Sequence, residues 1–420
     1  MKYYLWTIGC QMNKAESERL GGFFEKLGYE PTDTADAADL IVLNGCVVRQ
    51  SAETKIINKL ANLRALKKAH TGLIIAVTGC FVGPDTAALK KTYPHVDYFF
   101  KAGDFPPWLE KPSGILLPPR PSVTANVTIM QGCNNFCAYC IVPYRRGRER
   151  SRTVEDVVCE VTELARRGVK EVVLLGQNVD SYGHDLPDKP DLAGLLAELN
   201  KIEGIARIRF LTNHPKDMSD KLIDAIARLD KVCEQLSLPV QAGDNEILKA
   251  MRRGYTVEHF RELALRIREK VPEMALSTDM IVGFPSETEE QFRHSYDLMA
   301  ELRFDNVHMA AYSPREGTYA ARELKDDVSP EEKARRLDLI EKLEEQISTE
   351  INAALTGKTV EILVEGKKGG KWWGRTRSDK LVFFTSPENC FGLLIRVNIE
   401  KTGPWSLTGK AVSDAGEVPQ

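Results

Sequence analysis

Three cysteines close together carry the strongest chemical signal in this sequence. Cys133, Cys137 and Cys140 are separated by three and then two residues. A structural zinc site usually has a fourth Cys or His nearby, and this segment has none. Three thiolates without a fourth protein ligand instead indicate a four-iron, four-sulfur cluster that keeps one iron open.

The first hundred residues contain a second set of three cysteines. Cys10, Cys46 and Cys80 each follow a glycine at the end of a predicted strand. Because the carboxyl ends of parallel strands share one sheet edge, these thiols should converge there. The glycines permit the tight backbone that a cluster cradle needs. The arrangement predicts a second cluster, although each thiol taken singly could be a small buried apolar group.

The other cysteines have neither spacing nor strand-end placement in their favour. They are Cys159, Cys233 and Cys390. We expect all three to be buried packing residues, because free cysteine is among the most buried residue types. Nine cysteines in 420 residues without a signal peptide do not indicate a disulfide scaffold.

Two groups of basic residues could bind phosphate. The first directly follows the clustered cysteines and comprises Arg145, Arg146, Arg148, Arg150 and Arg152. The second lies beside Trp372 and Trp373 and comprises Lys367, Lys368, Lys371, Arg375, Arg377 and Lys380. Guanidinium groups bind phosphate through paired charge-assisted bonds, and exposed aromatic rings stack on unpaired bases. The alternatives are a solvated arginine run and two tryptophans packed in a core.

The segment 131–152 closely resembles the radical S-adenosylmethionine (SAM) methylthiotransferases, whose CxxxCxxC motif it contains. Within that family it is most similar to the MiaB type, which modifies isopentenyladenosine beside the tRNA anticodon. Residues 9–13 resemble the N-terminal domain of the family. Residues 374–376 and 407–409 resemble its TRAM domain, a small RNA-binding β-barrel. The resemblance covers essentially the whole chain.

This resemblance implies two [4Fe–4S] clusters with different roles. The catalytic cluster, on Cys133, Cys137 and Cys140, would bind SAM and cleave it to a 5′-deoxyadenosyl radical that abstracts hydrogen from the base. The cluster on the other three cysteines would carry the sulfur, which SAM methylates before transfer. The implied contacts with SAM are Gly176, Gln177, Asn178, Gln241, Gly243 and Gly283. The candidate RNA contacts are Arg146, Arg148, Arg150 and Arg375.

The expected activity is conversion of N6-isopentenyladenosine to its 2-methylthio derivative. The partners implied are a tRNA anticodon stem-loop and an electron donor such as flavodoxin or ferredoxin, and we expect a monomer. One alternative is a sister enzyme acting on threonylcarbamoyladenosine tRNA or on a ribosomal-protein aspartate. Another is a non-catalytic electron carrier with two clusters. In such a carrier a cysteine normally binds every iron, whereas each set here has only three cysteines.

The sequence predicts three domains that position these residues: two α/β domains followed by one small β-barrel. Residues 1–118 alternate short apolar runs, at 3–8, 40–43 and 73–77, with helical patterns, as in a parallel-sheet α/β domain. Residues 119–352 contain six β/α units and predict a partial TIM-like radical SAM barrel with a long final helix opened by Ser329. Residues 353–415 change to short alternating strands and predict the small TRAM barrel.

Composition adds two expectations. The net charge is −3, so RNA binding must depend on local basic patches. No apolar run approaches the roughly 20 residues that span a bilayer, so we expect a cytoplasmic protein without membrane contact.

Overall fold

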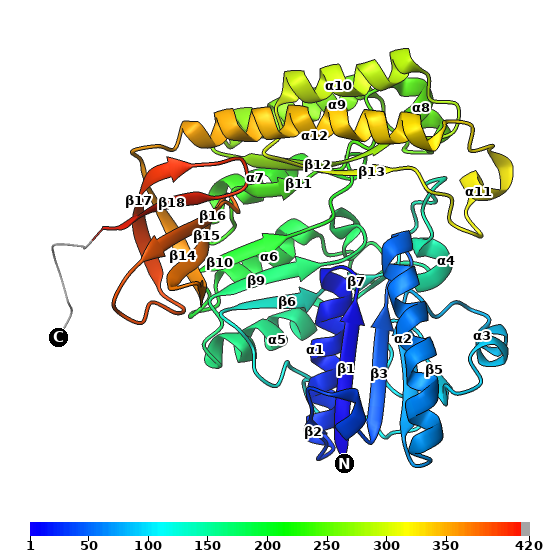
Figure 1. Ribbon diagram of the computed structural model, residues 1–420. Helices are drawn as coiled ribbons and strands as arrows, with labels where there is room; N and C mark the ends of the chain where they lie inside the picture. Colours follow the sequence, from blue (N-terminus) through cyan, green and yellow to red (C-terminus); the bar gives the residue numbers. More distant parts are fainter. Residues whose placement is uncertain (413–420) are drawn as a thin grey trace.

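The computed structural model describes residues 1–412, which form three parts along the chain (Figure 1). The first is a parallel sheet with helices on both faces, and its strand order is β2-β1-β3-β4-β5. Its strands are β1 (Lys2–Ile8), β2 (Glu30–Pro31), β3 (Leu40–Gly45), β4 (Ile74–Gly79) and β5 (Tyr98–Phe99). Its helices are α1 (Gln11–Lys26), α2 (Gln50–Ala69) and α3 (Thr86–Thr92). The two strands that the sequence did not predict, β2 and β5, have only two residues each, too few to show a periodic pattern.

The second part is the predicted partial barrel. Two parallel three-stranded sheets, β6-β9-β10 and β11-β12-β13, are joined by a bridge between Ile208 and Val232. The strands are β6 (Thr124–Thr128), β9 (Glu171–Leu175), β10 (Arg207–Phe210), β11 (Gln235–Ser237), β12 (Ala275–Val282) and β13 (Asn306–Ala311). The main helices are α5 (Val154–Arg166), α6 (Leu192–Asn200), α7 (Asp220–Arg228), α9 (Val257–Lys270) and α10 (Glu289–Leu302). Smaller elements are the hairpin of β7 (Met130–Gln131) and β8 (Arg150–Ser151), and the helices α4 (Val142–Arg146), α8 (Asn245–Ala250) and α11 (Tyr319–Glu323).

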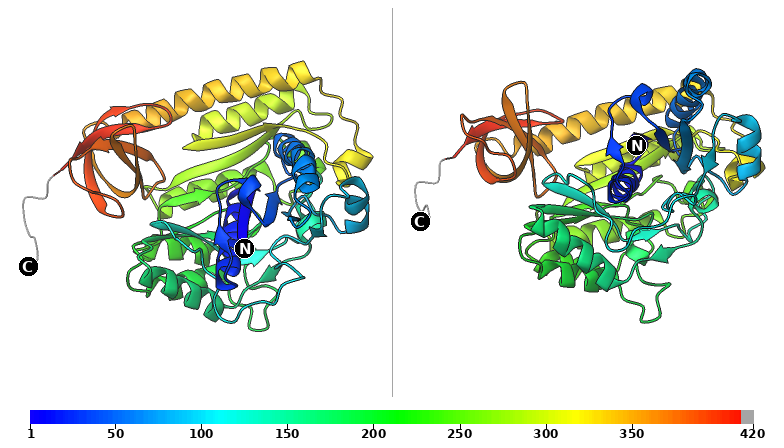
Figure 2. Two further views of the ribbon diagram at one scale, coloured as in Figure 1. Left: turned by 60° about the horizontal axis from the view of Figure 1, so that its bottom comes forward. Right: turned by 90° about the horizontal axis from the view of Figure 1, so that it is seen from below.

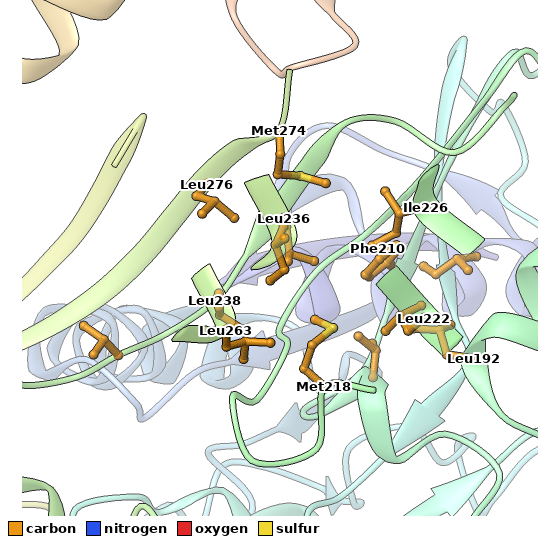
Figure 3. Packing of buried hydrophobic residues seen from close by; sticks show 14 of the residues in the cluster. Leu192, Phe210, Met218, Leu222, Ile226, Leu236, Leu238, Leu263, Met274 and Leu276 are labelled. Carbon is orange, nitrogen blue, oxygen red and sulfur yellow. The ribbon is translucent and has the colours of Figure 1, made fainter. Parts of the chain in front are cut away.

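The barrel strands present apolar side chains outward and polar ones inward. Leu236 and Leu276 pack in the core beneath the helices, where Phe210 meets Leu222 and Ile226 of α7 (Figure 3). Alternate positions on the same strands face the barrel interior and line a cavity: Gln235, Ser237, Ser277, Asp279, Asn306 and His308. Because side chains alternate along a strand, one short segment builds the core and a polar interior at once.

A long helix connects the barrel to the third part (Figures 1 and 2). The helix α12 (Pro330–Ala353) begins as predicted, with the Ser329 side chain accepting a hydrogen bond from the Glu332 amide. It leads into a closed five-stranded barrel of order β14-β15-β16-β18-β17. The strands are β14 (Thr359–Lys368), β15 (Lys371–Thr376), β16 (Leu381–Thr385), β17 (Leu394–Thr402) and β18 (Leu407–Ala411). Residues 413–415 of the predicted last domain lie outside the described residues.

The small barrel packs against the amino ends of the large barrel's strands. Arg207, the first residue of β10, donates to the Arg375 carbonyl at 2.7 Å, and Arg209 donates to the Arg377 carbonyl at 2.7 Å. Lys380 pairs with Asp305, which precedes β13, at 2.6 Å. The clustered cysteines follow the carboxyl end of β6, so they lie at the opposite end of the barrel. Within residues 1–412, no helix is long and apolar enough to cross a membrane.

Candidate active site

All six predicted ligand cysteines line one cavity of about 820 Å³. Cys10, Cys46 and Cys80 reach it from the N-terminal sheet, and the other three reach it from the loop after β7. Cys46 and Cys80 are buried, as are Cys133 and Cys137. The fold therefore brings together two thiol sets that are far apart in sequence and lie in different domains.

Strand register sets the three N-terminal thiols side by side. Ile8 pairs with Gly45, and Gly45 pairs with Gly79, so β1, β3 and β4 end level with one another. Gly79 has φ +87°, and a Cβ there would lie 2.3 Å from Asn44 Oδ1 and 2.6 Å from the Gly45 carbonyl oxygen. Asn44 in turn accepts a hydrogen bond from Asn13 at 2.8 Å. The glycine that precedes Cys80 is therefore required by both its φ and the close backbone approach.

Burial keeps most of these thiols protonated in the protein without a cluster. It raises the pKa of Cys133 to about 11 and the pKa of Cys80 and Cys140 to about 12, and it also raises the pKa of Cys46. Cysteine binds metal only as the thiolate. These cysteines would therefore lose their protons when an iron–sulfur cluster binds.

Each set of three cysteines has the ligands for one [4Fe–4S] cluster in which one iron remains open. Each set supplies three sulfur ligands, which are the donors that iron–sulfur clusters use. The thiolates of such a cluster bind different irons, so they need not close around one point. Among residues 1–412, no three Cys, His, Asp or Glu side chains close around a single-ion site.

Each thiol set receives hydrogen bonds from the protein. Arg146 Nε donates to Cys80 Sγ at 3.0 Å, and Arg253 Nη1 donates to Cys137 Sγ at 3.3 Å. The backbone amides of Val48 and Asn135 donate to Cys46 and Cys133 at 3.3 and 3.4 Å. These donors stabilise the ionised, ligating form of the sulfurs.

The predicted SAM contacts divide into two groups. Gly176, Gln177 and Gln241 line the cavity, and Gln177 Oε1 accepts from the Gly132 amide at 2.6 Å. The other three are not among the described residues that line the cavity: Asn178, Gly243 and Gly283.

Those three residues have structural partners instead. Asn178 is buried and donates to Asp217 at 2.7 Å. A Cβ on Gly243 would lie 2.6 Å from Ser295 Cα, and one on Gly283 would lie 2.4 Å from Lys333 Cγ. Both glycines therefore sit where backbone packs closely against a neighbouring helix.

The predicted RNA-contacting arginines also lie in different surroundings. Arg146 is buried and paired with Glu16, so its guanidinium is not presented to solvent. Arg148 is exposed and lies over the Phe136 ring, 4.5 Å from its centroid, and Arg150 is exposed on β8. Arg375 lines the far end of the cavity and pairs with Asp379 at 3.1 Å.

The far end of the cavity contains Trp405, which was not identified from the sequence. Trp405 is 53% exposed and lines the cavity, as does Lys380 of the predicted basic group. Trp372 packs in the core of the small barrel, while Trp373 is half-buried. Trp405 follows Gly403 and Pro404 in the turn before β18, so an aromatic residue in a turn was the available signal.

Arg253 and His214 are two further missed residues in the cavity lining. Arg253 is buried and also donates to the Pro239 carbonyl at 3.0 Å. Burial lowers the pKa of His214 to about 2, assisted by Arg253 and Lys216, so its imidazole is neutral. Neither residue belongs to a spacing pattern, because each reaches the cavity from a different loop.

The packing prediction is confirmed for two of the three remaining cysteines. Cys233 and Cys390 are buried, but Cys159 is exposed, so that expectation was wrong. Val157, Val161 and Leu164 form the buried face of α5. Cys159 is two residues from Val157, which turns it toward solvent.

Family comparisons match the three parts separately. Residues 2–101 match the Uncharacterized protein family UPF0004, residues 127–299 the Radical SAM superfamily, and residues 353–412 the TRAM domain. The tRNA-2-methylthio-N(6)-dimethylallyladenosine synthase of Dehalococcoides mccartyi (strain CBDB1) is 59% identical over 98% of both chains. The protein of the same name from Chloroflexus aurantiacus (strain ATCC 29366 / DSM 635 / J-10-fl) is 46% identical over 97% of this chain and 91% of its own.

Solved structures support the fold. The radical S-adenosylmethionine methyltransferase TsrM from Kitasatospora setae, with cobalamin and a [4Fe-4S] cluster bound, gives a TM-score of 0.55 at 14% identity. The match covers 77% of this chain and 74% of that chain.

Proposed function

Since this chain belongs to the family of tRNA-2-methylthio-N(6)-dimethylallyladenosine synthases, we propose that it attaches a methylthio group to N6-isopentenyladenosine (the dimethylallyl form) in tRNA. The observation that carries the proposal is the single cavity shared by six thiols from two domains. Such a cavity lets sulfur delivery and radical formation act on one bound base.

The radical SAM domain of this family uses SAM and a [4Fe–4S] cluster. We assign that cluster to Cys133, Cys137 and Cys140, and when bound it supplies the electron that cleaves SAM to a 5′-deoxyadenosyl radical. We assign a second cluster, as sulfur carrier, to Cys10, Cys46 and Cys80. One chain supplies all six thiols, which supports action as a monomer. A flavodoxin- or ferredoxin-type protein would donate the electron.

Side chains around the loop hold its thiols in place. The Asn134 amide and its Nδ2 both donate to the Glu149 carboxylate at 3.0 Å. Asn135 Nδ2 donates to Asp217 at 3.3 Å, and Lys216 donates to Asn135 Oδ1 at 2.7 Å. These bonds tie the ligand loop to Glu149, which directly precedes β8, and to the loop after β10.

We propose that the RNA contacts both ends of the cavity. Arg375 and Trp405 would take nucleotides near the small barrel, where a basic group and an exposed ring suit an unpaired base and its phosphate. Arg148 and Arg150 are exposed beside the ligand loop and would take phosphates at the other end. Arg146 is buried, so we do not include it among the proposed RNA contacts.

A single-turnover experiment tests the substrate. Matched tRNAs carrying isopentenyladenosine, threonylcarbamoyladenosine or plain adenosine would be compared by nucleoside mass spectrometry, with 5′-deoxyadenosine measured in parallel. We expect a methylthio product on the isopentenyl tRNA alone, because a site that recognises the isopentenyl group gains no apolar contact from plain adenosine and must exclude the larger, polar threonylcarbamoyl group. Equal reaction of all three, or reaction of the threonylcarbamoyl form alone, would overturn the substrate assignment.

A further inference from the structure

Arg146 is a buried cation with three hydrogen bonds, one of them to a cysteine sulfur. Its Nη1 and Nη2 donate to the Glu16 carboxylate at 2.5 and 3.2 Å. Its Nε donates to Cys80 Sγ at 3.0 Å. The side chains of Arg146 and Glu16 are 2% and 3% exposed, so solvent does not screen the group.

The arginine comes from one domain and the thiol from another. Arg146 ends α4, which begins two residues after Cys140, whereas Glu16 lies on α1 and Cys80 follows β4. Ile141, just before α4, is buried in the core of the N-terminal domain. A Cβ on Gly83 would lie 2.1 Å from Arg145 Nη1, so the next arginine also packs closely on that domain. The helix α4 therefore connects a ligand of one thiol set to a hydrogen-bond donor of the other.

The guanidinium remains charged in this position. Arginine does not lose its proton in proteins, and two hydrogen bonds to the Glu16 carboxylate stabilise its charged form here. Its N–H group contacts the sulfur directly, whereas the Glu16 carboxylate binds the other side of the guanidinium. The nearer positive group dominates the field at the sulfur.

We propose that Arg146 is a positioning residue that raises the reduction potential of the N-terminal cluster through its hydrogen bond to Cys80. The inference rests on the proposed assignment of Cys10, Cys46 and Cys80 as cluster ligands. Hydrogen bonds to ligand sulfur favour the reduced cluster, which is the more negative form. Transfer of a cluster-bound sulfur to a carbon radical would form a carbon–sulfur bond, break an iron–sulfur bond and release one electron, and the potential of the N-terminal cluster would determine how readily that cluster accepts the electron.

The experiment is a redox titration of the reconstituted full-length enzyme, followed by electron paramagnetic resonance, with iron content and thermal unfolding measured on each sample. Arg146→Gln should lower the midpoint of the N-terminal cluster and leave that of the barrel cluster unchanged. Glu16→Gln should raise the same midpoint, because it removes the negative partner. Arg253→Gln is the matched control, since it should lower only the barrel-cluster midpoint.

A double variant separates redox tuning from structural support. Arg146→Gln leaves Glu16 buried without a partner and should melt at a lower temperature. Arg146→Gln with Glu16→Gln removes both charges, so it should recover thermal stability, and its midpoint should lie below that of the wild type but above that of Arg146→Gln. A midpoint equal to that of the wild type in this double variant would overturn the inference, as would its failure to retain the cluster. A wild-type protein with iron for only one cluster would overturn the cluster assignment itself.

Discussion

Side chains of the same residue type differ in this protein mainly in what surrounds them. Cys80 and Cys159 are both free cysteines, but Cys80 is buried beside Arg146 and Cys159 points to solvent. The same contrast separates Arg146 from Arg150, which is exposed on β8 although only four residues away. Residue type suggests what chemistry is possible, and burial and partners decide which residue performs it.

At this scale the two thiol sets should be separable. The Cys10→Ala, Cys46→Ala, Cys80→Ala triple variant should contain about half the iron of the wild type and still form 5′-deoxyadenosine, but no methylthio product. The triple alanine variant of the barrel set should also contain half the iron and form neither. Iron analysis and Mössbauer spectroscopy measure the clusters. Two clusters in either variant would contradict the ligand assignment.

Strand ends and their glycines determine where the thiols lie. The parallel register brings β1, β3 and β4 to one edge, and the backbone at Gly79 then turns with φ +87° so that Cys80 joins the group. On β11 and β12, polar residues that face the barrel interior alternate with apolar residues that pack against the surrounding helices. An element therefore contributes to the site through its end and one face, while its other face builds the core.

Gly79→Ala should disrupt this strand end. The added Cβ meets Asn44 and Gly45 and the positive φ is strained, so we expect a loss of about 3–4 kcal/mol in unfolding free energy and loss of iron from the N-terminal set. Gly28→Ala is the control, because Gly28 has a similar φ of +81° with nothing within 4 Å. That variant should lose about 1 kcal/mol by denaturant unfolding and keep its iron. Equal effects of the two variants would contradict the proposed crowding.

Glu365 on β14 should make stability depend on pH. Burial raises the pKa of Glu365 to about 7, and nearby Arg375 offsets only part of the effect. Stabilisation from its neutral form is complete below pH 4.5, the ordinary value, and is lost as pH rises through 7. Glu365→Gln should therefore unfold like the wild type near pH 5 but be more stable by about 1–2 kcal/mol at pH 8. Thermal melts measure the stability of both proteins. The same stability difference between variant and wild type at both pH values would contradict the raised pKa of Glu365.

The three domains of the molecule meet around one cavity. The cysteines occupy the carboxyl end of the barrel, and the small barrel closes the amino end through Arg207, Arg209 and Lys380 (Figure 2). With a net charge of −3, the whole molecule does not attract RNA, so local groups must do so.

Trp405→Ala should weaken binding of the anticodon stem-loop. Stacking on an aromatic side chain contributes about 1–3 kcal/mol per base, so the affinity should fall roughly 5- to 150-fold. Phe391→Ala is the matched control, because Phe391 is 49% exposed on the same small barrel and is not among the described residues that line the cavity. Fluorescence anisotropy with labelled RNA measures both. Equal losses in the two variants would contradict a specific stacking role.

The sequence alone predicted two sets of three cysteines as cluster ligands and the order of the three folds along the chain. The spacing of Cys133, Cys137 and Cys140 and the glycine before each N-terminal cysteine are local features, so they could be recognised without a fold. Strand and helix periodicity likewise predicted the barrel, because alternation and helical repeats are set by neighbouring residues.

Which residues share the cavity depends on how the domains pack, and the sequence does not show this. Arg146 lies 130 residues from Glu16 and 66 from Cys80, and no local pattern connects such positions. Trp405 reaches the cavity because the small barrel docks on the large one, whereas Trp372 faces its own barrel core. Burial and long-range contact arise when domains pack together. A charge or an aromatic ring in the sequence therefore does not reveal whether it will face solvent, a thiol or a substrate.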